Sequence, residues 1–141
     1  MTPAISQPVA QHVMPSDIAR ATSLADRISL AVAWALRTCP LSREEVALRM
    51  SRALGQVVSV HMLAGYASQA REDHRITLER FIALVEATGR LELLGFVCSA
   101  FGAAAVPASH VELIELELIE AELRAIADRR REAVDRRRIA S

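Results

Sequence analysis

The stretch SREEVALRMSRALGQVVSVHMLAGY, residues 42–66, contains two helix starts separated by one helix stop. Ser42, followed three residues later by Glu45, forms a capping box, which commonly begins an α-helix. Gly55 ends the apolar stripe of this helix, and glycine readily adopts the left-handed backbone that follows many helices. Ser59 then provides a second N-cap. The stretch therefore predicts two helices joined by a turn.

Apolar residues on either side of this stretch also repeat at helical spacing. The helix before it ends ahead of Pro40, and its apolar positions are Leu24, Ile28, Val32 and Leu36. After the stretch, Thr77 can cap the helix LERFIALVEAT, and Gly89 follows as its stop. The apolar run of residues 91–106 predicts one further helix that packs next to it.

The composition suits one small helical domain with appendages. The chain has 141 residues, of which 52% are hydrophobic and only 4% aromatic, so its core must be mainly aliphatic. This balance favours helix packing over a β-sandwich, and we predict an all-α fold. Three prolines among small polar residues predict a flexible arm over residues 1–21, with order beginning near Thr22 or Ser23. A helical domain is expected over residues 22–106 and a long helix in residues 107–141.

The charged residues and the lack of known motifs exclude several functions. The formal net charge is zero, so any attraction to nucleic acid must come from a local patch. All 17 basic residues are arginine, which removes phosphate-loop and Schiff-base lysines from consideration. The sequence has no Gly-rich phosphate loop, no His-Glu-x-x-His motif and no cluster of Cys and His. We therefore expect no enzyme activity, no cofactor and no metal site.

The sequence also shows no feature of a membrane or secreted protein. Its most apolar run, residues 93–106, is shorter than the roughly 20 residues that a membrane span needs. The first residues lack a basic stretch followed by an apolar core, so no signal peptide is predicted. Cys39 and Cys98 lie in no paired motif, which suits a reducing compartment. We expect a cytoplasmic protein without a membrane partner.

A wider set of residues repeats a known helix-turn-helix pattern. The matching positions are Ala47, Gly55, Val58, Ser59, Leu63 and Tyr66, followed by Thr77, Leu78, Glu79, Phe81, Leu84, Ala87 and Gly89. Through them, residues 24–90 resemble the DNA-binding domains of the Cro and phage-repressor (XRE-like) family, and in particular small helix-turn-helix proteins of Mu-like transposable phages and prophages. Two departures are Val85, where the family has Ala, and a segment between Ala47 and Gly55 that is longer than the family's. The longer segment leaves the angle between the two helices open.

The resemblance implies that the helix beginning at Ser59 enters the major groove of double-stranded DNA. If Val60 and Leu63 face inward, the outer side carries the base-reading candidates His61, Met62, Gly65, Tyr66 and Gln69. Ser59 and the N–H groups at the helix start could hold a phosphate. Further candidates for phosphate contacts are Arg43, Arg49, Arg52, Arg71 and Arg75. Each candidate also has a plainer role open to it, as a solvated or a packing residue.

The end of the chain predicts one long helix with two apolar lines. One line has the alternating spacing of a coiled-coil seam and consists of Leu116, Ile119, Leu123 and Ile126. The other consists of Val111, Ile114, Leu118, Ala121 and Ala125. We expect one line to pack on its own domain and the other on a second subunit. Acids fill the first half of this helix and arginines the second, so two copies could pair antiparallel; the basic end could instead be a solvated face or contact DNA.

The predicted fold class is thus an all-α helix-turn-helix bundle with an additional C-terminal oligomerising helix. The leading hypothesis for its function is a sequence-specific DNA-binding regulator of transcription, phage-encoded and acting as a homodimer on two half-sites. One alternative is a small subunit of a DNA-packaging terminase, in which an oligomerising helix builds a ring. Another is a protein-interaction module that kept the fold without binding DNA, which the zero net charge would suit.

Overall fold

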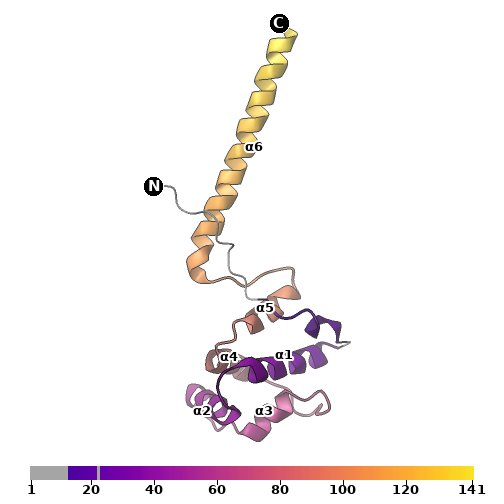
Figure 1. Ribbon diagram of the computed structural model, residues 1–141, viewed down its shortest axis with the longest axis vertical. Coiled ribbons are helices and arrows are strands. Elements are labelled where there is room, and N and C mark those ends of the chain that lie inside the picture. Colours follow the sequence, from indigo (N-terminus) through magenta and orange to yellow (C-terminus); the bar gives the residue numbers. More distant parts are fainter. Residues whose placement is uncertain (1–12, 22) are drawn as a thin grey trace. The chain divides into compact units, whose positions relative to one another are not determined.

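The computed structural model describes residues 13–21 and 23–141, and this part of the chain is helical without strands (Figure 1). The all-α prediction is confirmed. The chain divides into two units, residues 11–105 and the part that contains the last helix. The described helices are η1 (Ile18–Arg20), α1 (Leu24–Thr38), α2 (Arg43–Leu54), α3 (Val60–Tyr66), α4 (Leu78–Thr88), α5 (Glu92–Ser99), η2 (Ala108–His110) and α6 (Val111–Ala140).

Helices α2, α3 and α4 begin at the caps that the local sequence predicts, whereas α5 ends at Ser99, before the end of the apolar run of residues 91–106. Ser42 Oγ accepts a hydrogen bond from the N–H of Glu45 at 3.2 Å, at the start of α2. Ser59 and Thr77 cap α3 and α4 in the same way. Gly55 follows α2 in the left-handed conformation, with φ of 65°. These signals act within one helical turn, so they can be read without the tertiary structure.

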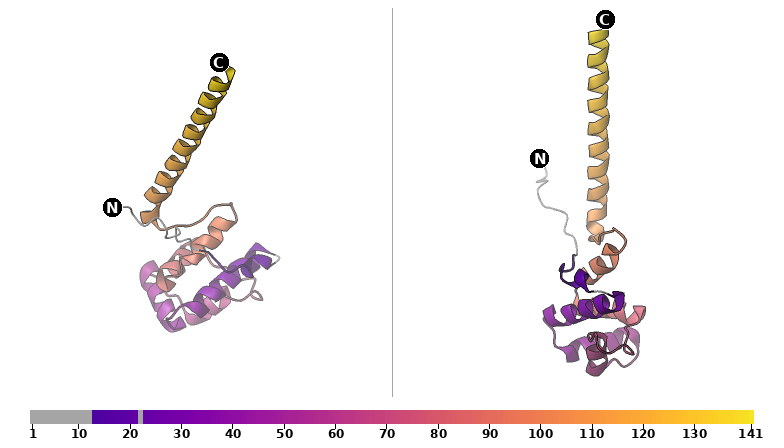
Figure 2. Two further views of the ribbon diagram at one scale, coloured as in Figure 1. Left: turned by 45° about the horizontal axis from the view of Figure 1, so that its top comes forward. Right: turned by 90° about the vertical axis from the view of Figure 1, so that its right-hand side faces the viewer.

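The core of the first unit lies between five helices. Helix α2 packs against α3 and α4, and α1 packs against α3 and α5 (Figure 2). The largest fully buried side chains are Met50, Leu63, Leu84, Leu93, Val32 and Val46. Every one of the five helices contributes at least one of them, so the core holds all five together.

The prediction of a flexible arm over residues 1–21 is wrong for residues 13–21, the part that the structure describes. Residues 1–12 and Thr22 lie outside the described residues. Within residues 13–21, however, Ile18 is only 5% exposed and belongs to the core, and Met14 packs against it. Prolines and small polar residues suggested an unpacked segment, but one aliphatic side chain inside the 3-10 helix η1 is enough to attach it. Order therefore begins before the expected boundary.

Helix α6 forms as one uninterrupted helix, and none of its side chains is buried in the single chain. Leu116, Ile119 and Leu123 are each about half exposed. In the second line, Val111 and Leu118 are exposed, and Ile114 is half-buried. The packing of one apolar line on the chain's own domain stays a prediction.

Replacing Ile18 by Ala tests whether residues 13–21 belong to the core. The change removes buried aliphatic surface and leaves a cavity, so the free energy of unfolding should fall by about 2 to 4 kcal/mol. Val13→Ala is the matched control, because Val13 is 61% exposed; its effect should stay below about 0.5 kcal/mol. Urea denaturation followed by circular dichroism measures both. Equal effects would show that the segment does not pack as described.

Candidate nucleic-acid interface

The turn between α2 and α3 is held by one side chain of α2. Ser51 Oγ accepts a hydrogen bond from the N–H of Val58 at 2.8 Å and donates to the carbonyl of Ala47 at 2.7 Å. The carbonyl of Val58 also lies 3.2 Å from the hydroxyl. Val58 is itself 4% exposed, so the turn is anchored both by hydrogen bonds and by burial. This anchor determines where Ser59 caps α3.

The orientation of α3 corrects the predicted outer face. His61 is exposed, as expected, but Gly65 and Tyr66 are buried and Met62 is half-buried against the core. Leu63 is in the core and Val60 packs against it, as the predicted inner face requires, but the observed inner face also includes Tyr66. The placement of Gly65 and Tyr66 among the DNA-reading residues is therefore wrong, and that of Met62 is wrong in part.

Tyr66 is buried because its hydroxyl has a partner on α4. Arg80 Nη1 donates a hydrogen bond to the Tyr66 hydroxyl at 2.6 Å. The Arg80 guanidinium carbon also lies 6.0 Å from the centroid of the tyrosine ring, within cation–π range. A buried tyrosine needs such a partner, and Arg80 was not among the predicted functional residues. The pair joins α3 to α4.

Gly65 makes room for the loop that follows α3. A Cβ atom built on Gly65 would lie 2.8 Å from Cδ2 of His74 and 3.0 Å from its Cβ and Cγ. The His74 ring also packs edge-to-face with that of His61, with centroids 6.3 Å apart. The glycine thus permits close packing of the loop of residues 68–76 rather than close approach of DNA.

The remaining predicted contact residues lie on the surface of α2, α3 and the loop. Seven of them are exposed, namely Arg43, Arg49, Arg52, His61, Gln69, Arg71 and Arg75. Ser59 is half-buried as the N-cap. Sequence reasoning missed Gln56 and Val57, which are exposed in the turn, Val57 to 84%. Their place between Gly55 and the Ser59 cap could have suggested this exposure.

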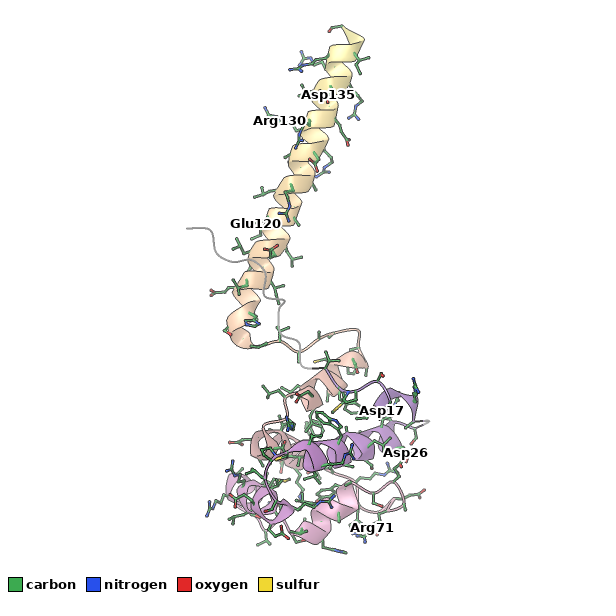
Figure 3. All side chains as sticks on the ribbon, viewed as in Figure 1. Asp17, Asp26, Arg71, Glu120, Arg130 and Asp135 are labelled. Atoms are coloured by element: carbon green, nitrogen blue, oxygen red, sulfur yellow. The ribbon has the colours of Figure 1, made fainter. Side chains whose placement is uncertain are left out.

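Acidic neighbours reduce the positive charge of this surface. Arg49 Nε lies 3.3 Å from a carboxylate oxygen of Glu45, one turn away on α2. In the loop, Arg71 (labelled in Figure 3) is exposed, and the exposed Glu72 and Asp73 follow it in the sequence. The pKa of Asp73 is lowered, chiefly by hydrogen bonding with His74, so this carboxylate is charged at neutral pH. The five candidate arginines therefore give only a modest local positive field.

The first unit also contains an apolar cavity. It has a volume of about 680 Å³ and lies between residues 13–18, the start of α1, the start of α4, and α5 with the residues after it. Aliphatic and aromatic side chains form most of its wall, and among the described residues that line it Arg27 is the one that carries a charge. The cavity shares none of its lining with the predicted contact residues.

Within residues 13–21 and 23–141, no group of three or more His, Cys, Asp or Glu side chains is arranged to hold a metal ion. No helix of that part of the chain combines the length and apolarity needed to cross a bilayer. Comparison with protein-family models, curated proteins and solved structures found no match to this chain.

Ser51→Ala should lower the free energy of unfolding by about 1 to 3 kcal/mol, because the N–H of Val58 stays buried without its partner. Ser99→Ala is the control: the Ser99 hydroxyl also donates to a helix carbonyl, that of Phe96, but it is exposed. The control should change stability by a few tenths of a kcal/mol. Guanidinium denaturation measures both variants. If they were equally stable, Ser51 would not be the anchor of the turn.

Gly65→Ala should destabilise the protein although Ala is the better helix former, because the new methyl group meets His74. In a His74→Ala background the ring is gone, so the same substitution should cost less. A double-mutant cycle by chemical denaturation measures the difference, which should be about 0.5 kcal/mol or more. Additive effects would mean that His74 does not cover Gly65.

Proposed function

We propose that this protein is a sequence-specific double-stranded-DNA-binding protein, a phage or prophage transcriptional regulator of the helix-turn-helix class that acts as a homodimer. The observation that supports it best is the pair α2 and α3, joined by an anchored turn, together with the exposure of His61, of Gln69 and of the arginines of α2 and the loop. The resemblance of residues 24–90 to Cro-like domains adds to this.

In the proposed complex, α3 lies in the major groove and α2 crosses the backbone. His61 can donate to or accept from a base edge, and the Gln69 amide can do both at once. Arg43, Arg49 and Arg52 contact phosphates from the side of α2, and Arg71 and Arg75 from the loop. Because Tyr66 and Gly65 are buried, the reading surface is small, and specificity depends on binding two half-sites together.

A protein-interaction module is the second candidate. Its support is the near balance of charge on the candidate surface, where five arginines share residues 42–75 with Glu44, Glu45, Glu72 and Asp73. A module of this kind would retain the helix-turn-helix shape and bind a protein through exposed apolar residues such as Val57. The third alternative, a terminase-like ring, would need the same DNA contacts as the regulator, and the mass of the assembly distinguishes the two.

Selection from a random library of duplex DNA, followed by binding measurements at two salt concentrations, tests the proposal. Arg52→Gln and Arg71→Gln should each weaken binding to all sequences and lower the slope of log K against log salt by about 1. His61→Ala should instead relax base preference at one position of the half-site, at a cost of about 1 to 3 kcal/mol.

Arg20→Gln is the matched control, since Arg20 is an exposed arginine of η1, outside the proposed interface. This variant should bind every duplex as the unchanged protein does. Absence of salt-dependent binding to any duplex would reject the DNA-binding proposal and favour the interaction module. A particle mass of eight or more chains would favour the packaging subunit over the dimeric regulator.

A further inference from the structure

Helix α6 has too much exposed apolar surface to remain alone. Nine of its large apolar side chains are between 42% and 85% exposed, namely Val111, Leu113, Leu116, Leu118, Ile119, Leu123, Ile126, Val134 and Ile139. Most helical stability in proteins comes from packing an amphipathic face rather than from intrinsic propensity. The exposed apolar side chains of α6 therefore form a face on which a partner can pack.

The apolar seam of α6, formed by Leu116, Ile119, Leu123 and Ile126, is symmetric in its spacing about Ala121. Leu116 and Ile126 stand five residues on either side of Ala121, and Ile119 and Leu123 stand two residues on either side. The same alternating spacing continues to Glu112 and Arg130, nine residues on either side. An apolar seam thus ends in an acid at one end and a base at the other, at equal distances from its centre.

We propose that this face pairs with α6 of a second copy of the chain, antiparallel, about a twofold axis at Ala121. The inference specifies the homodimer of the proposed function but does not depend on DNA binding. Leu116 then packs against Ile126 of the partner subunit, and Ile119 against Leu123 of the partner subunit. Glu112 meets Arg130 of the partner subunit at both ends of the seam.

Charge decides the antiparallel direction. Besides the two end pairs, Glu115 comes beside Arg129 of the partner subunit, so acids meet bases along both ends. A parallel pair in register would bring Glu112 against its own copy, Arg130 against its own copy and Glu115 against Glu120 of the partner subunit. Each of these contacts is repulsive, two of them inside the seam.

Like charges at the centre of the antiparallel pair oppose its formation. Glu120 and Glu122 flank Ala121 and therefore face their own copies near the axis. Arg124 lies one turn after Glu120 on the same helix, a spacing at which the two charges attract each other. Glu120 and Arg130 project from α6 one after the other along its length (Figure 3). The apolar residues and the charged ends hold the pair, and the central acids weaken it.

A charge-swap cycle on the full chain, measured by sedimentation equilibrium without DNA, tests the register. Glu112→Arg and Arg130→Glu should each raise the Kd of the dimer about tenfold, because each places like charges together at both ends. The combined variant E112R/R130E restores opposite charges and should return to within about threefold of the unchanged protein. Glu117→Arg, the same charge change outside the seam, is the control and should have little effect.

Two results would overturn the proposal. In a parallel pair, both single variants and the combined variant would keep the number of like-charge contacts and dimerise as the unchanged protein does. If α6 packed against a different protein, the unchanged chain would sediment as a monomer at micromolar concentration.

The variant Leu123→Glu provides a second check. A buried unpaired charge should dissociate the dimer, while circular dichroism still reports the folded first unit. Because no DNA is present, failure here is distinct from failure of DNA binding.

Discussion

The hydrogen bonds between Ser51 and Val58 determine the geometry on which the candidate interface depends. Helix α3 has only seven residues and could not persist by itself, because the cost of nucleating so short a helix exceeds what its own hydrogen bonds return. Its position is set by the anchored turn before it, by Leu63 in the core and by the Tyr66–Arg80 pair toward α4. The turn is anchored from α2 and Tyr66 from α4, so α3 is held by two different helices.

This way of holding α3 limits what its surface can do. The residues that attach it, Leu63, Gly65 and Tyr66, are three of its seven residues and are buried away from any ligand. His61 remains, with Gln69 and the exposed turn before the helix. A short helix with few free side chains can read only a few bases, and phosphate contacts from arginines would position it on the DNA. The pairing of two units is therefore important for the proposed function.

Helix α6 poses the opposite physical problem. None of its 30 residues is classed as buried, and they carry both an apolar line and a separation of charge along the axis. Five acids lie from Glu112 to Glu122 and seven arginines from Arg124 to Arg138, where three further acids offset part of the positive charge. This polarity also favours the helix dipole. In the proposed pair the same polarity provides the match between two copies, so one pattern stabilises the helix and selects its partner.

The sequence by itself determined the boundaries of α2, α3 and α4 and the all-α class. Ser42, Ser59, Thr77 and the glycines at positions 55 and 89 act on backbone groups within one turn, and such signals need no knowledge of the rest of the chain. The exposure of His61 and of the arginines of α2 also followed from helical spacing.

Only the tertiary structure decided which way α3 faces and what residues 13–21 do. Tyr66 is buried because Arg80, fourteen residues later, reaches its hydroxyl, and Gly65 is covered because the loop brings His74 onto it. Ile18 is buried because α1 and its neighbours provide a surface for it. Period and propensity describe one segment at a time, whereas these three outcomes depend on side chains that approach from elsewhere in the chain.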